Sequence, residues 1–178
     1  VQVRRAAAEK LGQLGETGVK AAQGYLHSDQ TGTVEAALQA VGCGHTAWGR
    51  SLLHSELHRR VHEAGLAWLA AHTLPPTSLE QRFLSEALRQ EVQRHTHLAF
   101  QAMRWLEGEE LVETVRLAVA AHGGRRASAL EVLSNLGDRQ VSQLFVTLLE
   151  PATATWLSGL CTPRTPGCVG RHSRPMAA

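Results

Sequence analysis

The chain has 178 residues, of which 43% are hydrophobic and only 4% aromatic, and a formal net charge of +2. This length accommodates one domain or a short stack of repeats, and the abundance of Ala and Leu favours packed helices over a β-sandwich. No run of 18 uncharged apolar residues occurs, so a membrane span is not expected. All 16 acidic residues lie within 1–150, together with 15 of the 18 Lys and Arg residues. This part has no basic surplus, so nucleic-acid binding is not expected either.

Eight helices follow from the spacing of apolar residues and from the capping and breaking residues between them. The paired prolines in TLPPTS, residues 73–78, end one long helix, and Ser78 with Gln81 forms a capping box that opens the next. Gly123–Gly124 ends a later helix. We expect the helices near residues 2–14, 17–27, 32–42, 47–72, 78–106, 109–122, 125–136 and 139–149.

The first helix recurs later in the chain. VRRAAAEKLGQLGE at residues 3–16 aligns without gaps on RRASALEVLSNLGD at residues 125–138. The distance in sequence between the two segments corresponds to about four repeat units of about 30 residues each. A fainter copy, VEAALQAVGCG, occupies residues 34–44. The first helix is therefore interpreted as a repeat element. The matched residues of the strong pair are Arg4 with Arg126, Ala7 with Ala129, Glu9 with Glu131, Leu11 with Leu133, Leu14 with Leu136 and Gly15 with Gly137.

VRRAAAEKLGQLGE resembles the first helix of a HEAT repeat, and GVKAAQGYLHSD resembles the second helix of the same unit. Residues 52–150 resemble the helical-repeat regions of bacterial proteins in which HEAT repeats accompany a membrane transporter or a cyclic-nucleotide-binding module. The resemblance implies an all-α fold, a right-handed α-solenoid of stacked antiparallel helix pairs, over residues 1–150. It carries over neither transport nor nucleotide binding. The segments that carry the second likeness are SELHRRVHEAGLAWLAA, LSEALRQEVQRHTHLAFQAMRWLEGEELV and RRASALEVLSNLGDRQVSQLFVTLLE.

Residues 151–178 differ from the rest, with four of the six prolines and no helical or strand period, so we expect a disordered tail. Cys161, Cys168 and His172 match no standard zinc spacing, and we expect no metal and no other cofactor. An odd number of cysteines without an export leader predicts a cytoplasmic protein. Because the chain begins at Val1 rather than Met, we expect a fragment of a larger protein.

Histidines are frequent, with ten in the chain. His54, His58 and His62 form a stripe with a spacing of four, interpreted as a solvated flank. The apolar face beside this stripe is predicted to consist of Leu53, Leu57, Val61, Ala64 and Trp68. On the helix at 78–106, Leu84, Leu88, Val92, Ala99, Met103 and Leu106 gather on one side. His95 falls among them, so we expect it to be buried with one hydrogen bond and no carboxylate partner, while His97 is exposed.

Two functions remain open. No nucleophile–base pair, phosphate-binding glycine loop or metal quartet is recognisable, so we expect no enzyme but a non-catalytic interaction scaffold or regulatory repeat module. Its partner would be another protein or an adjacent domain of the same chain. The alternative is a HEAT-like catalytic or ligand-handling subunit, similar to a bilin lyase or a DNA glycosylase. The candidate binding face is a polar row without carboxylates, suited to an acidic or carbonyl-rich surface: Gln90, Arg94, His97, Gln101 and Arg104.

Overall fold

The computed structural model describes residues 2–75, 77–121 and 124–150 of the chain. Over these ranges it contains eight α-helices and no strand, so the described part is all-helical. The helices are α1 (Gln2–Gln13), α2 (Glu16–Gln23), α3 (Thr31–Cys43), α4 (Ala47–Thr73), α5 (Leu79–Glu107), α6 (Glu109–Ala120), α7 (Gly124–Ser134) and α8 (Arg139–Leu149).

The predicted helices are confirmed in number and order, and their boundaries differ by a few residues. The largest difference is at α2, which ends at Gln23 rather than 27 because Gly24 ends the helix and a turn follows. The capping box is confirmed: the Ser78 hydroxyl accepts from the Gln81 backbone N–H, and the Gln81 side chain accepts from the Ser78 N–H. The predicted tail lies outside the described residues, as does Gly123.

Two glycines that the repeat alignment pairs share an unusual backbone conformation. Gly15 has φ 62° and Gly137 has φ 64°, in the left-handed region that side chains with a Cβ rarely adopt. Both lie in the link between two short helices, Gly15 directly before α2 and Gly137 directly before the N-cap Asp138 of α8, and the left-handed glycine that the alignment predicts is present in each. The two segments therefore share a local structure as well as a sequence pattern.

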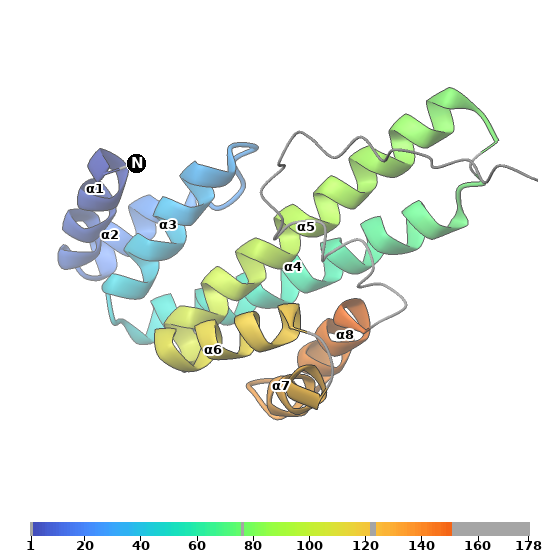
Figure 1. Cartoon of the computed structure of the whole chain (residues 1–178). Helices are drawn as coiled ribbons and strands as arrows, with labels where there is room; N and C mark the ends of the chain where they lie inside the picture. The colour runs from blue at the N-terminus through green and yellow to red at the C-terminus, as the bar shows by residue number, and fades with distance from the viewer. Residues whose placement is uncertain (1, 76, 122–123, 151–178) are drawn as a thin grey trace, which may run out of the picture.

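A long antiparallel hairpin of α4 and α5 forms the centre of the molecule (Figure 1). At the end of the hairpin opposite the α4–α5 connection, α3 packs between α1 and α5, and α2 packs on α3. After α5 the chain turns back through α6 and α7, and α8 lies against α4. The free end of the hairpin extends beyond the other described helices, as Figure 1 shows.

One continuous apolar core joins these helices. Phe145 of α8 is fully buried, and its ring centroid lies 4.9 Å from that of Phe100 on α5. The predicted apolar face of α4 is confirmed at Leu53, Leu57 and Val61, all of them buried. Over the described residues, no helix combines the length and apolar character needed to cross a membrane.

The predicted apolar face of α5 is wrong at its beginning. Val92 and Met103 are buried, but Leu84 is 50% exposed and Leu88 only half-buried. The first part of α5 belongs to the end of the hairpin that extends beyond the other described helices, where α4 is its neighbour. The helical period of the face is correct from Val92 onward, and the length of the neighbouring helices determines where burial stops.

Candidate functional site

Buried and half-buried charged side chains gather where α4 packs on α5, beneath the connection between α2 and α3. Arg60 is only 2% exposed and Glu56 only 4% exposed, which is rare for charged residues unless they are paired. A small cavity of about 220 Å³ opens beside them, under His27, Ser28 and Asp29. We call this set the polar cluster: Glu56, Arg59, Arg60 and Glu63 from α4 with Glu91, Arg94 and His95 from α5.

The polar cluster ties α4 to the end of the first helix pair. An Arg60 Nη donates to the Leu26 carbonyl oxygen at 2.6 Å, and an Arg59 Nη donates to the same oxygen at 3.1 Å. Arg59 also binds Glu56 at 2.5 Å and Glu63 at 3.0 Å. Two consecutive arginines thus bind one backbone carbonyl and pair with two carboxylates, so the cluster acts as a structural clamp.

His95 lies inside the polar cluster. The predicted burial of His95 and exposure of His97 are confirmed. The expectation that His95 has no carboxylate partner is wrong: its Nδ1 lies 3.0 Å from a Glu63 oxygen and its Nε2 3.4 Å from a Glu91 oxygen. Glu91 is one helical turn away on α5, whereas Glu63 comes from α4 and is not paired with His95 by any sequence spacing.

Burial lowers the pKa of His95 below its ordinary value. The carboxylates of Glu63 and Glu91 raise this pKa, but the positive charges of Arg94 and Arg60 lower it, and the net effect is a lowered pKa. The same two effects act on Arg60, whose pKa is lowered by burial first and by Arg59 second. His95 is therefore held in its neutral form more strongly than a histidine in water.

We expect the folded state to lose stability as the pH falls through the range just below about 6.5, the ordinary pKa of histidine. Because the folded-state pKa of His95 is lowered, the unfolded chain binds the proton more readily, and the contribution of neutral His95 is complete only above that range. Urea unfolding midpoints at pH 7.5 and 5.5 measure the loss. The difference should shrink in His95→Gln and persist in His62→Gln, whose side chain is exposed. An equal pH dependence in wild type and His95→Gln would contradict it.

The predicted binding row on α5 is largely paired within the chain. Arg94 binds Glu91 at 2.7 Å, His97 lies 2.6 Å from a Glu35 oxygen on α3, and Arg104 pairs with Glu109 at the start of α6. The interpretation of an uncompensated row is therefore wrong, because carboxylates from other positions and helices neutralise it. Gln90 is exposed and Gln101 half-buried. Partner binding by the row stays a prediction, without the charge argument that supported it.

The histidine stripe on α4 faces outward at two of its three positions. His58 and His62 are exposed and His54 is half-buried, in line with a solvated flank. The Nε2 of His58 lies 3.8 Å from an Asp138 oxygen at the start of α8. In the ranges that the structure describes, no three His, Cys, Asp or Glu residues are placed to hold a metal ion. Cys161, Cys168 and His172 lie outside those ranges.

An apolar groove of about 280 Å³ runs along the contact of α4 with α8 and is lined by residues of both helices. On the α4 wall Leu66 and Leu69 are 57% and 54% exposed, and on the α8 wall Leu144 is 38% exposed. Trp68 and the buried Leu148 complete the apolar lining. Such a concentration of exposed leucines is typical of an interaction surface rather than of a plain solvated face. No pattern in the sequence pairs α4 with α8, so sequence analysis missed this groove.

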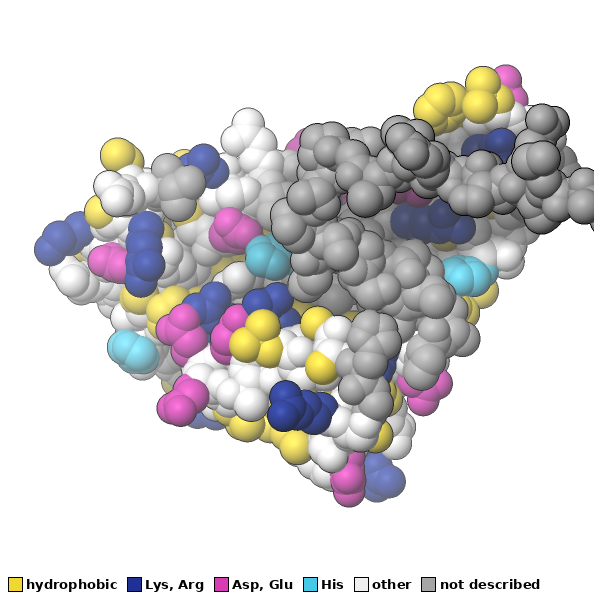
Figure 2. All heavy atoms as spheres, viewed as in Figure 1, with side chains coloured by type: hydrophobic (Ala, Val, Ile, Leu, Met, Phe, Trp, Pro, Cys, Tyr) yellow, Lys and Arg dark blue, Asp and Glu magenta, His cyan; other side chains and the backbone are white. Residues whose placement is uncertain are grey.

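Hydrophobic side chains are also exposed at the free end of the hairpin, as Figure 2 shows at the upper right. Leu79 and Phe83 of α5, 64% and 69% exposed, belong to this region. The groove differs from this region because its apolar lining is drawn from two helices, α4 and α8.

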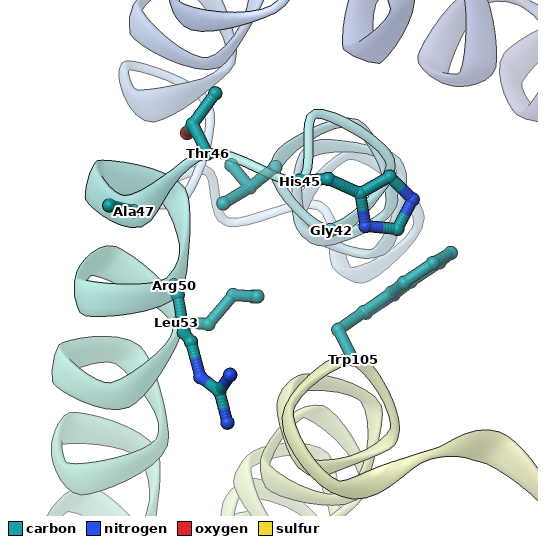
Figure 3. Close-up of a pocket in the computed structure, with 8 residues that line it drawn as sticks. Gly42, His45, Thr46, Ala47, Arg50, Leu53 and Trp105 are labelled. Carbon is teal, nitrogen blue, oxygen red and sulfur yellow. The ribbon is translucent and has the colours of Figure 1, made fainter.

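A third candidate is a pocket of about 390 Å³ between the end of α3, the start of α4 and the end of α5. Leu53 forms its buried base, and Figure 3 shows the His45 imidazole near the Trp105 indole on one side, with the Arg50 guanidinium on another. Trp105 packs directly on the Gly42 backbone. This site combines an aromatic ring with two basic side chains, and the sequence gives no signal for it because the three helices meet only in the fold.

Comparison of the chain with known protein families, with curated proteins and with solved structures gives no match. The geometry of the described residues is therefore the basis for a functional proposal.

Proposed function

We propose that the chain forms a HEAT-like, right-handed α-solenoid and functions as a non-catalytic protein-interaction scaffold in the cytoplasm. The apolar groove between α4 and α8 carries this proposal. The contacts of α3 with both α1 and α5 support the repeat architecture, because in a solenoid every second helix stacks on its counterpart in the next unit. The matched glycines at 15 and 137 support it independently.

The groove is shaped for an amphipathic helix of a partner protein. Its walls are themselves helices, with Leu66 and Leu69 three positions apart on α4 and Leu144 and Leu148 four positions apart on α8. A third helix with apolar residues at the same spacings can place its side chains between these rows. Burial of exposed leucines provides a favourable free energy of roughly 25 cal/mol for each Å² of apolar surface removed from water.

Site-specific photo-crosslinking tests this proposal. A photoreactive amino acid at Leu69, on the groove wall, should capture a partner protein, whereas the same group at exposed Arg82 on α5 should not. Binding of the captured partner, measured by calorimetry with purified components, should weaken at least about tenfold in the double variant Leu69→Glu, Leu144→Glu, because two charges would be desolvated in an apolar contact.

A matched double variant separates the groove from the row predicted on α5. Gln90→Glu with Arg104→Glu also introduces two glutamates into the row, but outside the groove and outside the polar cluster. This variant should bind the partner as wild type does. Loss of binding here, with binding retained in the leucine double variant, would assign the interaction to the row. Failure to capture any partner at Leu69 would count against the groove.

A further inference from the structure

We propose that the pocket between α3, α4 and α5 binds a small organic anion that carries a planar ring. The ring would stack on Trp105 beside His45, and the anionic group would bind the guanidinium of Arg50 (Figure 3). This site is separate from the groove between α4 and α8, and the two share no lining residue.

The size of the pocket suits a small molecule. Its volume of about 390 Å³ falls in the lower part of the roughly 300–1,000 Å³ range of ligand pockets. Leu53, only 3% exposed, closes its base, and Val41 and Gly42 belong to the buried end of α3. A ligand bound here would therefore contact a rigid apolar floor.

Trp105 is held in position by its contact with α3. A Cβ added to Gly42 would lie 2.2 Å from Cδ2 of the indole, so only glycine permits this close approach. Trp105 is nevertheless 38% exposed, which leaves part of its surface uncovered. An aromatic side chain that is already fixed loses little conformational freedom when a ring stacks on it, which favours binding.

The basic side chains at the rim are available to a ligand. Arg50 is exposed and, within the described ranges, forms neither an ion pair nor a side-chain hydrogen bond. The same holds for His45, while Arg59, Arg94 and Arg104 all pair with glutamates. An arginine without a carboxylate partner, beside an aromatic ring, matches a carboxylate or phosphate attached to a ring.

The backbone at His45 adds a local constraint. His45 has φ 47°, and it is the one residue other than glycine in the described part of the chain with a positive φ. This conformation is uncommon for side chains with a Cβ. It turns the chain between α3 and α4 so that the imidazole stands at the rim beside Trp105 (Figure 3).

Titration of the full chain with indole-3-propionate, an aryl carboxylate, tests the proposal. We expect saturable binding by calorimetry and a shift of the Trp105 indole N–H resonance, assigned from its absence in Trp105→Phe. Arg50→Gln should weaken binding about tenfold or more, because a hydrogen bond between charged groups would be lost. Arg82→Gln, at an exposed position on α5, is the matched control and should bind as wild type does.

A neutral ligand of the same shape separates charge recognition from apolar contact. Indole-3-propionamide should bind at least about tenfold more weakly than the acid. Gly42→Ala should also weaken binding of the acid, because the new methyl displaces the indole. Absence of saturable binding at millimolar acid, equal affinity of acid and amide, or unchanged affinity in Arg50→Gln would each overturn the proposal.

Discussion

Replacement of Arg60 by alanine is expected to lower the free energy of unfolding by about 3 kcal/mol, near the lower end of the range for removing one partner of a buried ion pair. The side chain of Arg60 is 3% exposed, and one of its nitrogens donates to the Leu26 carbonyl at 2.6 Å. Its removal also leaves Glu56, itself buried, with Arg59 as its remaining cation. Because Arg59 still binds Glu56 and the same carbonyl, the loss stays below the upper limit.

Two further variants identify the cause of that loss. Arg60→Met preserves much of the buried volume and should be less destabilising than Arg60→Ala, because the cavity it leaves is smaller. Arg89→Ala removes an exposed arginine that lies 3.6 Å from Glu86 and should change stability by about 0–1 kcal/mol. Urea unfolding followed by far-ultraviolet circular dichroism measures all three. If Arg60→Ala and Arg89→Ala destabilised equally, the polar cluster would not be a structural clamp.

Much of the local structure could be predicted from the sequence because its causes are local. The capping box at Ser78 and the left-handed glycine at Gly137 depend on residues within one turn of each other, so a short segment of sequence predicts each of them. The buried position of His95 followed from helical periodicity. Such features depend on backbone geometry that neighbouring residues set almost alone.

Features that depend on how two separate helices pack together could not be predicted in the same way. The exposure of Leu84 depends on the hairpin extending past its neighbours, and the pairing of His97 depends on Glu35, 62 residues away. One long-range feature did leave a partial signal. Glu56 and Glu63 stand three and four positions from Arg59, a spacing that predicts ion pairs on one helix, but nothing in it indicates that the adjacent Arg60 is buried.

The candidate sites also divide into features with local causes in the sequence and features that depend on contacts between separate helices. The row on α5 could be found by spacing, and so could the pairing of Arg94 with Glu91 three positions away on the same helix. The carboxylates of Glu109 and Glu35 could not be placed, because they approach the row from other helices. The groove and the ring-binding pocket each need three-dimensional contacts: α4 with α8, and Gly42 with Trp105. At Trp105 the fold leaves the aromatic ring partly uncovered.

Replacement of Phe145 by alanine is expected to lower the free energy of unfolding by about 3–5 kcal/mol, the usual range for Phe to Ala in a core. Phe145 is fully buried, and its ring packs 4.9 Å from Phe100, so α8 is joined to the hairpin through this contact. Phe83→Ala is the matched control: it deletes the same atoms at a position that is 69% exposed, and should change stability by about 0.5 kcal/mol or less. Urea unfolding compares the two.

The same pair of variants links stability to the proposed function. Because Leu144 and Leu148 of α8 form one wall of the groove, loosening α8 should weaken partner binding and raise amide hydrogen exchange in α8 above that in α3. The ring-binding pocket has no residue from α8, so affinity for indole-3-propionate should remain unchanged in folded Phe145→Ala protein. Equal stability of Phe145→Ala and Phe83→Ala, or unaltered exchange in α8, would show that Phe145 does not anchor this helix.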